Sequence, residues 1–186
     1  MAGRRSASQE LPDTLIEIDD FDARYRDWAR EMLRRTWGST RVVSRGQIRE
    51  AIDLPGYVAL IERQPAGLAT YMITEDECEL TTINSLDPGI GVGSALLQAV
   101  KEAAQQAHCR RLWLITTNDN MNALRFYQRR GFSLAALHRN ALDASRRLKP
   151  EIPLIGVDGI PLRDEIELEL ILVDDRQSGG ARQEPY

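Results

Sequence analysis

Hydrophobic and polar positions in the first half of the chain follow two different periods. Residues 14–18 alternate apolar with polar side chains, which predicts a first short strand. Residues 21–37 place aromatic and aliphatic side chains at three- and four-residue steps, the spacing of an amphipathic helix. Residues 36–47 are predicted to form a loop, and residues 47–52 a short helix that stops before a Pro-Gly pair.

Three β-rich runs come next, at residues 57–62, 68–74 and 78–86. The first two are separated by residues 63–67, RQPAG, a composition that predicts a hairpin turn. Because the connections between these runs are short, the strands are expected to form an antiparallel meander.

The second half alternates helical and extended patterns. Residues 95–107 carry an apolar face at helical spacing, and residues 111–117 form an apolar run typical of a strand in a parallel pair. Residues 122–130 predict a further helix, and residues 132–138 and 165–173 two more strands. A strand, a crossover helix and a strand form a βαβ unit. The pattern therefore predicts an α/β (α+β) fold, with one mixed, mainly antiparallel sheet, a central parallel βαβ unit and flanking helices.

Domain organisation is simple at this level. A single domain is expected over residues 13–175, between disordered tails at residues 1–12 and 176–186. Residues 148–163, LKPEIPLIGVDGIPLR, form a long connection before the last strand. Connections of that length are usually functional or disordered, and the apolar residues here argue against disorder.

A glycine-rich stretch, LDPGIGVGSALL, links the meander to the next helix. Gly91 and Gly93 allow a tight turn in which several main-chain N–H groups converge at a helix N-terminus, which is a site for a phosphate or pyrophosphate. In the alternative interpretation, Pro88 and Gly89 make an ordinary turn and the other glycines only permit close packing. A short glycine motif alone does not separate the two interpretations.

Composition narrows the function classes. The chain has 186 residues, 42% hydrophobic and 28% charged, which is typical of a soluble globular protein. Its 24 basic and 28 acidic residues give a net charge of −4, which argues against a general nucleic-acid binder and tolerates a cationic partner such as an amine.

Cysteine and apolar content add two expectations. Cys78 and Cys109 have no metal-ligand spacing around them, so they are read as reduced thiols and no metal is expected. No stretch reaches the ~20 apolar residues of a membrane span, and the N-terminus lacks the apolar core of a signal peptide. A cytoplasmic protein that does not enter membranes is expected.

Two motifs in order resemble the acyl-CoA-binding half of the GNAT superfamily of N-acetyltransferases. The first is GVGSALLQAVKEAA, which corresponds to the family's pyrophosphate loop and helix. The second is NDNMNALRFYQRRGF, which contains the family's spacing of Asn, Ala, Tyr and Gly-Phe. In this chain those positions are Asn120, Ala123, Tyr127, Gly131 and Phe132.

The resemblance implies acetyl-CoA as co-substrate and assigns roles to particular residues. The pyrophosphate would be held by main-chain amides of Gly89, Gly91, Val92, Gly93 and Ser94. The strand edge at Ser85 and Leu86 would pair with the pantetheine arm as if it were a strand, and Asn120 and Ala123 would contact the same arm.

Tyr127 resembles the family's general acid, which protonates the leaving thiolate. The alternative is a helix-face aromatic that packs with Phe126 and Leu124. A general base is expected from Glu79, with Glu77 as a second candidate, although both also suit solvated turn positions. His138 is a third candidate because its pKa lies near neutrality.

One departure from the family lies in the pyrophosphate loop. The family usually has Gln or Arg three residues before the first paired glycine, whereas this chain has Pro88 there, beside Asp87. An acid near a pyrophosphate and the loss of a charge-assisted contact predict weaker binding of CoA.

The acceptor is expected to contact Trp37 and Arg45, which follow the first aromatic helix, and the connection at residues 148–163 is expected to lie over that end of the site. An arginine there would favour an amine that bears a carboxylate or phosphate, unless the arginine is simply solvated. Small amines, aminoglycoside-like compounds, peptide N-termini and lysines all remain open as acceptors, and a homodimer is compatible with the sequence.

Two functions stay open at this point. One is an enzyme that moves an acetyl group from acetyl-CoA to a primary amine by direct attack, which Tyr127 favours. The other is a non-catalytic acyl-CoA-binding sensor or interaction module on the same fold, which Asp87 and Pro88 favour slightly.

Overall fold

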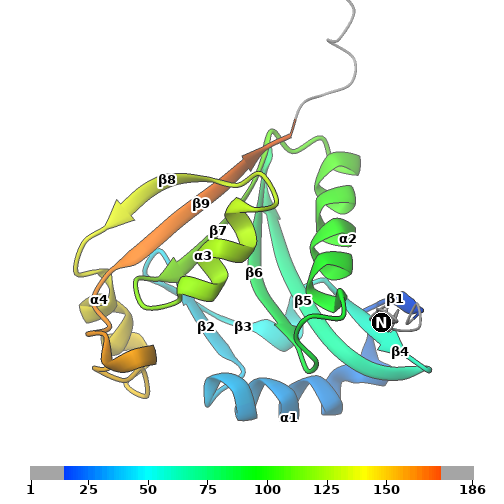
Figure 1. Cartoon of the computed structure of the whole chain (residues 1–186), viewed down its shortest axis with the longest axis horizontal. Helices are drawn as coiled ribbons and strands as arrows, with labels where there is room; N and C mark the ends of the chain where they lie inside the picture. Colours follow the sequence, from blue (N-terminus) through cyan, green and yellow to red (C-terminus); the bar gives the residue numbers. More distant parts are fainter. Residues whose placement is uncertain (1–14, 173–186) are drawn as a thin grey trace, which may run out of the picture.

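The computed structural model describes residues 15–172, so the tails predicted at residues 1–12 and 176–186 lie outside the described residues. The main sheet contains seven strands in the order β1-β4-β5-β6-β7-β9-β8 (Figure 1). Its strands are β1 (Ile16–Asp20), β4 (Gly56–Ile61), β5 (Gln64–Thr74), β6 (Glu77–Ser85), β7 (Arg111–Thr117), β8 (Ser133–His138) and β9 (Glu165–Ile171).

The remaining elements pack around this sheet. A separate hairpin consists of β2 (Arg41–Ser44) and β3 (Gln47–Glu50). The helices are α1 (Arg26–Trp37), α2 (Val92–Gln106), α3 (Met121–Gln128) and α4 (Ala141–Leu148), with short 3-10 turns at Ala23–Tyr25, Ala51–Asp53 and Val157–Gly159.

Strand direction confirms the predicted mixed sheet. β4, β5 and β6 form the antiparallel meander, and β7 and β8 each pair antiparallel with β9. Within the part of the chain that the structure describes, only β6 and β7 are parallel, and α2 is the crossover between them. The α/β fold with a central βαβ unit is therefore the one the residue pattern predicts.

Two apolar layers hold the sheet. On one face α2 packs through Leu96 and Val100, both fully buried, against the meander strands. On the other face α1 packs through Ala29 and Leu33, also fully buried, against Val58 and its neighbours. Burial of a Leu or Val side chain stabilises the fold by about 1.5–3 kcal/mol, so each helix is fixed by its apolar stripe.

The predicted helix at residues 47–52 is wrong, and so is an unstructured loop at residues 36–47. Residues 41–44 and 47–50 pair as a hairpin, because a turn at Arg45 and Gly46, both with positive φ, matches the twist of the flanking strands. The backbone groups of such a short segment are better satisfied by this pairing than by one isolated helical turn.

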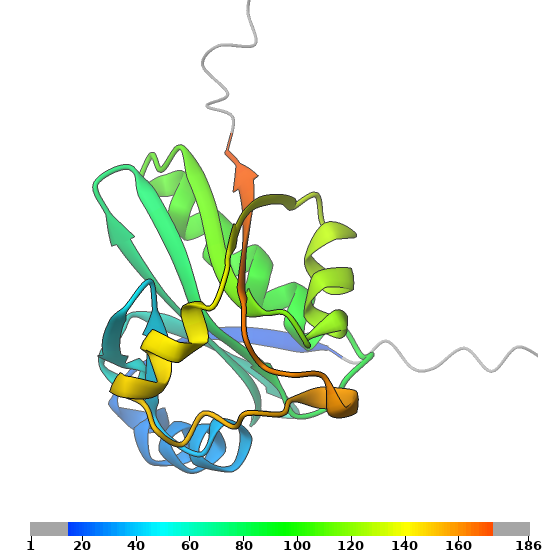
Figure 2. The same ribbon diagram turned by 90° about the vertical axis from the view of Figure 1, so that its left-hand side faces the viewer.

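Two further local expectations need correction. The turn between β4 and β5 lies at Glu62 and Arg63, both with positive φ, so β5 already begins within the predicted turn at residues 63–67. Helix α4 was not predicted. Figure 2 shows α4 and the segment after it passing over the sheet beside the β2–β3 hairpin, on the way to β9.

Candidate active site

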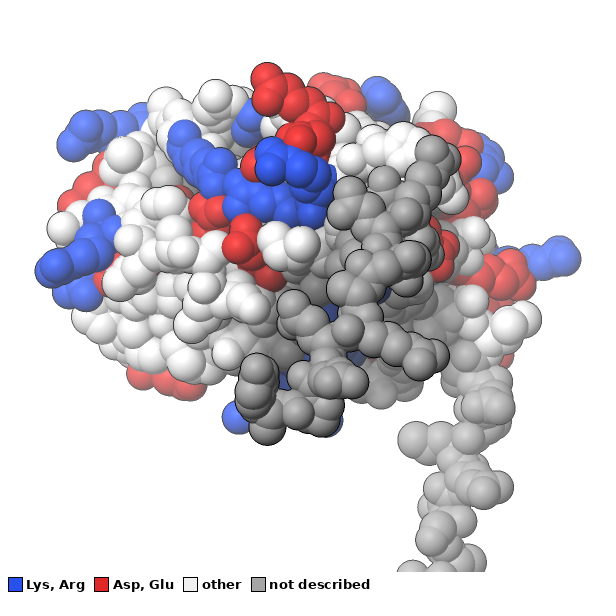
Figure 3. Space-filling model, turned by 90° about the horizontal axis from the view of Figure 1, so that it is seen from above, with Lys and Arg blue, Asp and Glu red and all other residues white. Residues whose placement is uncertain are grey.

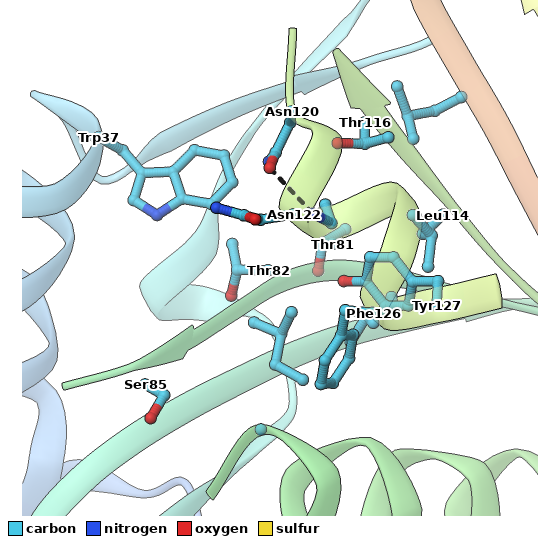
Figure 4. A pocket seen from close by; sticks show the side chains of 15 residues that line it. Trp37, Thr81, Thr82, Ser85, Leu114, Thr116, Asn120, Asn122, Phe126 and Tyr127 are labelled. Carbon is cyan, nitrogen blue, oxygen red and sulfur yellow. Dashed lines mark hydrogen bonds between the residues drawn. The ribbon is translucent and has the colours of Figure 1, made fainter. Parts of the chain in front are cut away.

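A cavity of about 290 Å³ lies where β6 and β7 diverge. The parallel pairing covers only residues 77–79 and 111–113, so beyond Glu79 one edge of β6 has no strand partner. A register shift beside Thr81 bends the strand at this point. Helix α3 lies across the gap and, with Trp37 from the end of α1 and Gly93 from the start of α2, completes the walls (Figure 4).

The glycine loop after β6 ends at the N-terminus of α2, beside this cavity. Gly91 is the N-cap residue and has a φ of 100°, a left-handed conformation that favours glycine. Its carbonyl accepts hydrogen bonds from the N–H groups of Ser94 and Ala95, so the amides of Val92 and Gly93 precede the first bonded turn. Free amides at the positive end of a helix dipole form an anion-binding site.

The predicted cofactor-binding residues divide into two groups. Those that line the cavity are Ser85, Gly93, Asn120 and Ala123. The others surround it: Leu86 is half exposed and donates its amide to the Ala66 carbonyl, while the Val92 side chain is buried in the core. Gly89, with a φ of 96°, turns the chain toward α2.

Asn120 has a structural task as well as a place in the cavity wall. Its Oδ1 accepts a hydrogen bond from the Ala123 amide at 3.0 Å and so caps α3 (Figure 4). Among the described residues nothing accepts a hydrogen bond from its side-chain NH₂ group, which leaves two donors at the cavity wall.

Tyr127 places its ring in the core and its hydroxyl at the cavity. The ring centroid lies 5.1 Å from that of Phe126 and 5.4 Å from that of Phe132, so the predicted packing role is present. A buried tyrosine hydroxyl usually has a hydrogen-bond partner. Within residues 15–172 none is found for this one, and Figure 4 shows it pointing away from α3 into the cavity. Burial raises the pKa of the phenol far above its ordinary value, which keeps it protonated at neutral pH.

A second cavity, of about 470 Å³, continues from the first. The two share part of their lining, namely Trp37, Leu80, Thr81, Ile115, Thr116 and Asn120. The second cavity is closed by β2, by α4 and by Ile152, Pro153 and Leu162 of the connection before β9. The connection at residues 148–163 therefore lies over one end of the site, as the sequence predicted.

Glu79 is the candidate base that lines this second cavity. Its side chain is buried, and no Arg or Lys of the described residues lies within ion-pair distance of it. The Ser44 hydroxyl lies nearby but makes no hydrogen bond of acceptable geometry. Burial raises the pKa of the Glu79 carboxyl. The two other candidates are engaged elsewhere: Glu77 pairs with Arg111 at 2.9 Å, and His138 with Glu167 at 3.1 Å.

Comparison with known proteins agrees with this geometry. A family model described as the acetyltransferase (GNAT) family matches residues 22–132. The chain belongs to the acetyltransferase (GNAT) family.

The chain is also similar to a known relative in sequence and to solved structures in fold. The uncharacterized protein YdhI of Bacillus subtilis (strain 168) is 45% identical over 131 residues, which cover 70% of this chain and 82% of that protein. The IAA acetyltransferase from Bacillus cereus ATCC 14579 has a similar fold, with a TM-score of 0.68, 22% identity and coverage of 85% of this chain and 100% of the other. A GNAT family acetyltransferase from Elizabethkingia anophelis with acetyl-CoA bound gives a TM-score of 0.62 at 20% identity, over 84% of this chain and 98% of that one.

Among the residues predicted to contact the acceptor, this GNAT chain brings only Trp37 to the cavities. The Arg45 guanidinium forms an ion pair with Glu167 at 2.6 Å and lies over the Trp113 ring, 4.0 Å from its centroid. It lines a separate hollow on the other side of Glu79. Its charge is therefore matched by a buried carboxylate, and its side chain does not line either of the two cavities.

Sequence reasoning assigned no role to Arg130, which the structure places beside the glycine loop. Its guanidinium donates a hydrogen bond to the Ser94 hydroxyl and another, at 2.8 Å, to the Phe126 carbonyl. It also lies 3.6 Å from the centroid of the Phe126 ring. No carboxylate of the described residues pairs with it. The pair of arginines after Tyr127 was the available signal, but its proximity to α2 depends on the tertiary structure.

Sequence reasoning also missed the residues that anchor the connection over the second cavity. The Asn118 Oδ1 accepts hydrogen bonds from the amides of Arg163 and Asp164, both at 2.9 Å. The Asp119 Oδ2 accepts one from the Val157 amide at 2.8 Å. These bonds hold the connection against the end of β7, so one polar turn both starts α3 and positions the roof of the cavity.

Three other features bear on binding partners. On the face seen in Figure 3, one group of basic side chains lies beside acidic ones near the middle, and a broad area without charged side chains adjoins it. Within residues 15–172 no helix is long and apolar enough to cross a bilayer. The same residues contain no group of three His, Cys, Asp or Glu side chains placed to bind a metal ion.

Proposed function

We propose that this protein transfers an acetyl group from acetyl-CoA to a primary amine by direct attack, with Tyr127 as the general acid and Glu79 as the general base. The observation that carries the proposal is the continuity of two cavities. One is lined by Tyr127, whose hydroxyl has no hydrogen-bond partner within residues 15–172, and the other by the buried Glu79 carboxyl. A thiol leaving group and an attacking amine need a proton donor and a proton acceptor on opposite sides of one reacting carbon.

The first cavity fits the arm of acetyl-CoA. The unpaired edge of β6 offers main-chain groups to an extended amide chain, as in strand addition. Asn120 offers its free side-chain NH₂ group to the same arm, and the amides at the start of α2 suit a pyrophosphate. When bound, acetyl-CoA supplies the activated thioester.

Tyr127 would donate its proton as charge develops on the sulfur. Its phenol stays protonated at neutral pH because burial raises its pKa. The same desolvation makes a thiolate next to Tyr127 a stronger base. The proton therefore passes from the phenol to the thiolate within one low-dielectric cavity. Because no group within residues 15–172 forms a hydrogen bond with the hydroxyl, its proton can be donated to a sulfur atom in the cavity.

Glu79 would accept the proton of the amine, directly or through water. A raised pKa makes its carboxylate a stronger base than an exposed glutamate, which suits this task. Trp37 lies between the two cavities and would form part of the acceptor wall.

The test is a thiol-release assay with acetyl-CoA and a panel of primary amines, together with a calorimetric titration of acetyl-CoA. Binding of acetyl-CoA with thiol release that depends on an added amine is the expected result. Binding without turnover of any amine would instead favour the non-catalytic acyl-CoA-binding module.

Replacement of Arg130 by alanine is expected to raise the KM for acetyl-CoA about tenfold or more, with kcat unchanged. The loop has Asp87 and Pro88 where the family usually has Gln or Arg, and Arg130 would supply a positive charge there from the end of α3. Loss of a charge-assisted hydrogen bond costs about 1.5–3 kcal/mol, which corresponds to that change. Steady-state kinetics with varied acetyl-CoA measure it.

The matched control is Arg129→Ala, which removes the same charge one residue earlier in the chain. It should leave the KM for acetyl-CoA close to that of the parent protein. Equal KM values in both variants would mean that Arg130 only packs on Phe126.

The pH profile of kcat/KM is expected to show an acidic limb that depends on Glu79. The carboxylate must be deprotonated to accept a proton, and burial raises its pKa, so activity should decline on acidification earlier than an exposed glutamate would allow. Glu79→Gln should lower the rate by about 10²- to 10⁴-fold and remove this contribution to the limb.

Protonation of the acceptor amine also contributes to the limb, so both proteins are measured with the same amine and only the difference is interpreted. Glu75→Gln, in the exposed turn after β5, serves as the control and should keep the parent profile. An unchanged limb in Glu79→Gln would assign the base to another group.

A further inference from the structure

Five glutamates share one face of the sheet, and two of them line the second cavity. Glu79 is paired in register with Trp113 of β7, and Glu165 lies opposite Thr117 of the same strand. Residues paired across neighbouring strands point to the same face, and odd-numbered positions of β6, β7 and β9 therefore lie together. The face holds Glu77, Glu79, Glu165, Glu167 and Glu169.

Three of these glutamates are neutralised by neighbouring cations. Glu77 and Glu169 pair with Arg111 at 2.9 Å and 2.7 Å. Glu167 pairs with Arg45 at 2.6 Å and with Arg111 at 3.1 Å. Glu79 and Glu165 have no such partner among the described residues, and these two line the cavity.

Glu165 is almost fully buried, at 4% exposure, and its partners are few. Its Oε1 accepts a hydrogen bond from the Ser145 hydroxyl at 2.8 Å, while within residues 15–172 no hydrogen bond reaches its Oε2. A buried carboxylate without a cation is costly unless a ligand or an ordered polar group completes it. The Glu165 carboxylate is therefore a buried hydrogen-bond acceptor at the cavity wall, held in position by Ser145.

The other ionisable groups that line the second cavity, apart from Glu79, are already held by protein groups. The Lys149 ammonium donates hydrogen bonds to the carbonyls of Arg41, at 2.9 Å, and Trp37, at 3.4 Å, so it is held by the backbone. Glu151 is paired with Arg41 at 3.0 Å. The lining as a whole contains three carboxylates against one ammonium, and it is bounded by the Trp37 ring and aliphatic side chains.

We propose that the acceptor is a dicationic amine whose reacting nitrogen lies near Glu79 and whose second cationic group binds Glu165, an inference that rests on the acetyl transfer proposed above. Four residues of β7 and two strand spacings separate the two glutamates, which places their Cα atoms roughly 16 Å apart. A flexible aliphatic spacer between the two charges would lie along the apolar wall. The charge preference is opposite to the anionic acceptor that the sequence suggested from Arg45.

The test compares three acceptors of equal chain length: hexamethylenediamine, hexylamine and aminocaproate. They differ only in whether the far end is cationic, apolar or anionic. We expect kcat/KM to be about tenfold or more higher for the diamine than for hexylamine, as a charge-assisted hydrogen bond implies, and lowest for aminocaproate. Equal values for the three, or a preference for aminocaproate, would overturn the inference while acetyl transfer itself stands.

Glu165→Gln removes the charge but keeps the volume and the hydrogen bond from Ser145. It should raise the KM for the diamine about tenfold, to the level of hexylamine, and leave the KM values for hexylamine and acetyl-CoA unchanged. Glu102→Gln is the control, because that glutamate is exposed on α2 and lines neither cavity, and it should keep the selectivity of the parent protein.

A binding measurement separates this inference from the proposed activity. Hexamethylenediamine and hexylamine are titrated calorimetrically into the CoA-saturated protein and into its Glu165→Gln variant. Tighter binding of the diamine that is lost in the variant supports the inference even where no amine is turned over. No difference between the two amines in the parent protein overturns it.

Discussion

Gly91→Val is expected to abolish measurable acetyl-CoA binding while the protein stays folded. Gly91 has a φ of 100°, and a β-branched residue in that region costs on the order of 1–3 kcal/mol, so the loop would change its path. An added Cβ would also lie 3.4 Å from the Ile16 side chain. Because the N-cap sets the direction of the amides of Val92 and Gly93, its displacement removes the anion site. Isothermal titration calorimetry and far-UV circular dichroism measure the two effects.

Gly93→Val tests the same site by a different physical route. Its added Cβ would lie 3.4 Å from the Phe126 ring, on which Arg130 is stacked, so the substitution disturbs the cation beside the loop. Gly46→Val is the matched control for strain at positive φ, because Gly46 has a φ of 71° in the β2–β3 turn with no atom near its added Cβ. Unchanged acetyl-CoA affinity in folded Gly91→Val and Gly93→Val would contradict the proposed phosphate site.

Tyr127→Phe is expected to lower kcat by about 10²- to 10⁴-fold and to leave acetyl-CoA affinity unchanged, because it removes a proton donor. The ring contacts with Phe126 and Phe132 are kept, and the hydroxyl has no protein partner to lose within residues 15–172. The melting temperature should therefore stay close to that of the parent protein, and steady-state kinetics with a responsive amine measure the loss.

A matched control for this substitution is Tyr71→Phe. Tyr71 stacks on Tyr57 with ring centroids 5.9 Å apart, and burial raises its pKa to about 12. It lines neither cavity, so this variant should retain kcat. If Tyr127→Phe also retained full turnover, Tyr127 would be a packing residue and the proton donor would have to be sought elsewhere.

The regular elements of the sheet could be predicted because their information is local. The three runs that became β4, β5 and β6 alternate or continue apolar side chains over few residues, and short connections leave only an antiparallel order. The glycine loop and the Asn-to-Tyr spacing are likewise local, because a left-handed N-cap and a helix face are set within a dozen residues. The family resemblance rested on these two motifs.

Elements whose stability comes from distant partners could not be predicted in this way. The β2–β3 hairpin was read as a loop and a helix because its strands are short. Helix α4 was not predicted. It is amphipathic, and it packs against residues far away in the sequence. Helix α4 contacts β2, so its stabilising contact joins segments that sequence patterns treat separately. The hairpin itself is local, and its strands of four residues each are too short for a clear alternating pattern.

The sequence by itself predicted the type of site: a glycine loop for a phosphate in the βαβ unit, a tyrosine on the following helix and a carboxylate near the start of the central strand. Only the tertiary structure decided which charges are free. Arg45 forms an ion pair with Glu167, more than 100 residues later in the chain, and Arg130 comes to lie beside Ser94. Glu165, in the second cavity, has no cationic partner within residues 15–172. The residue type fixes the charge of a side chain, but the tertiary structure decides whether an opposite charge lies beside it. The energy of a Coulomb interaction depends on the distance between the two charges in space and on how deeply they are buried.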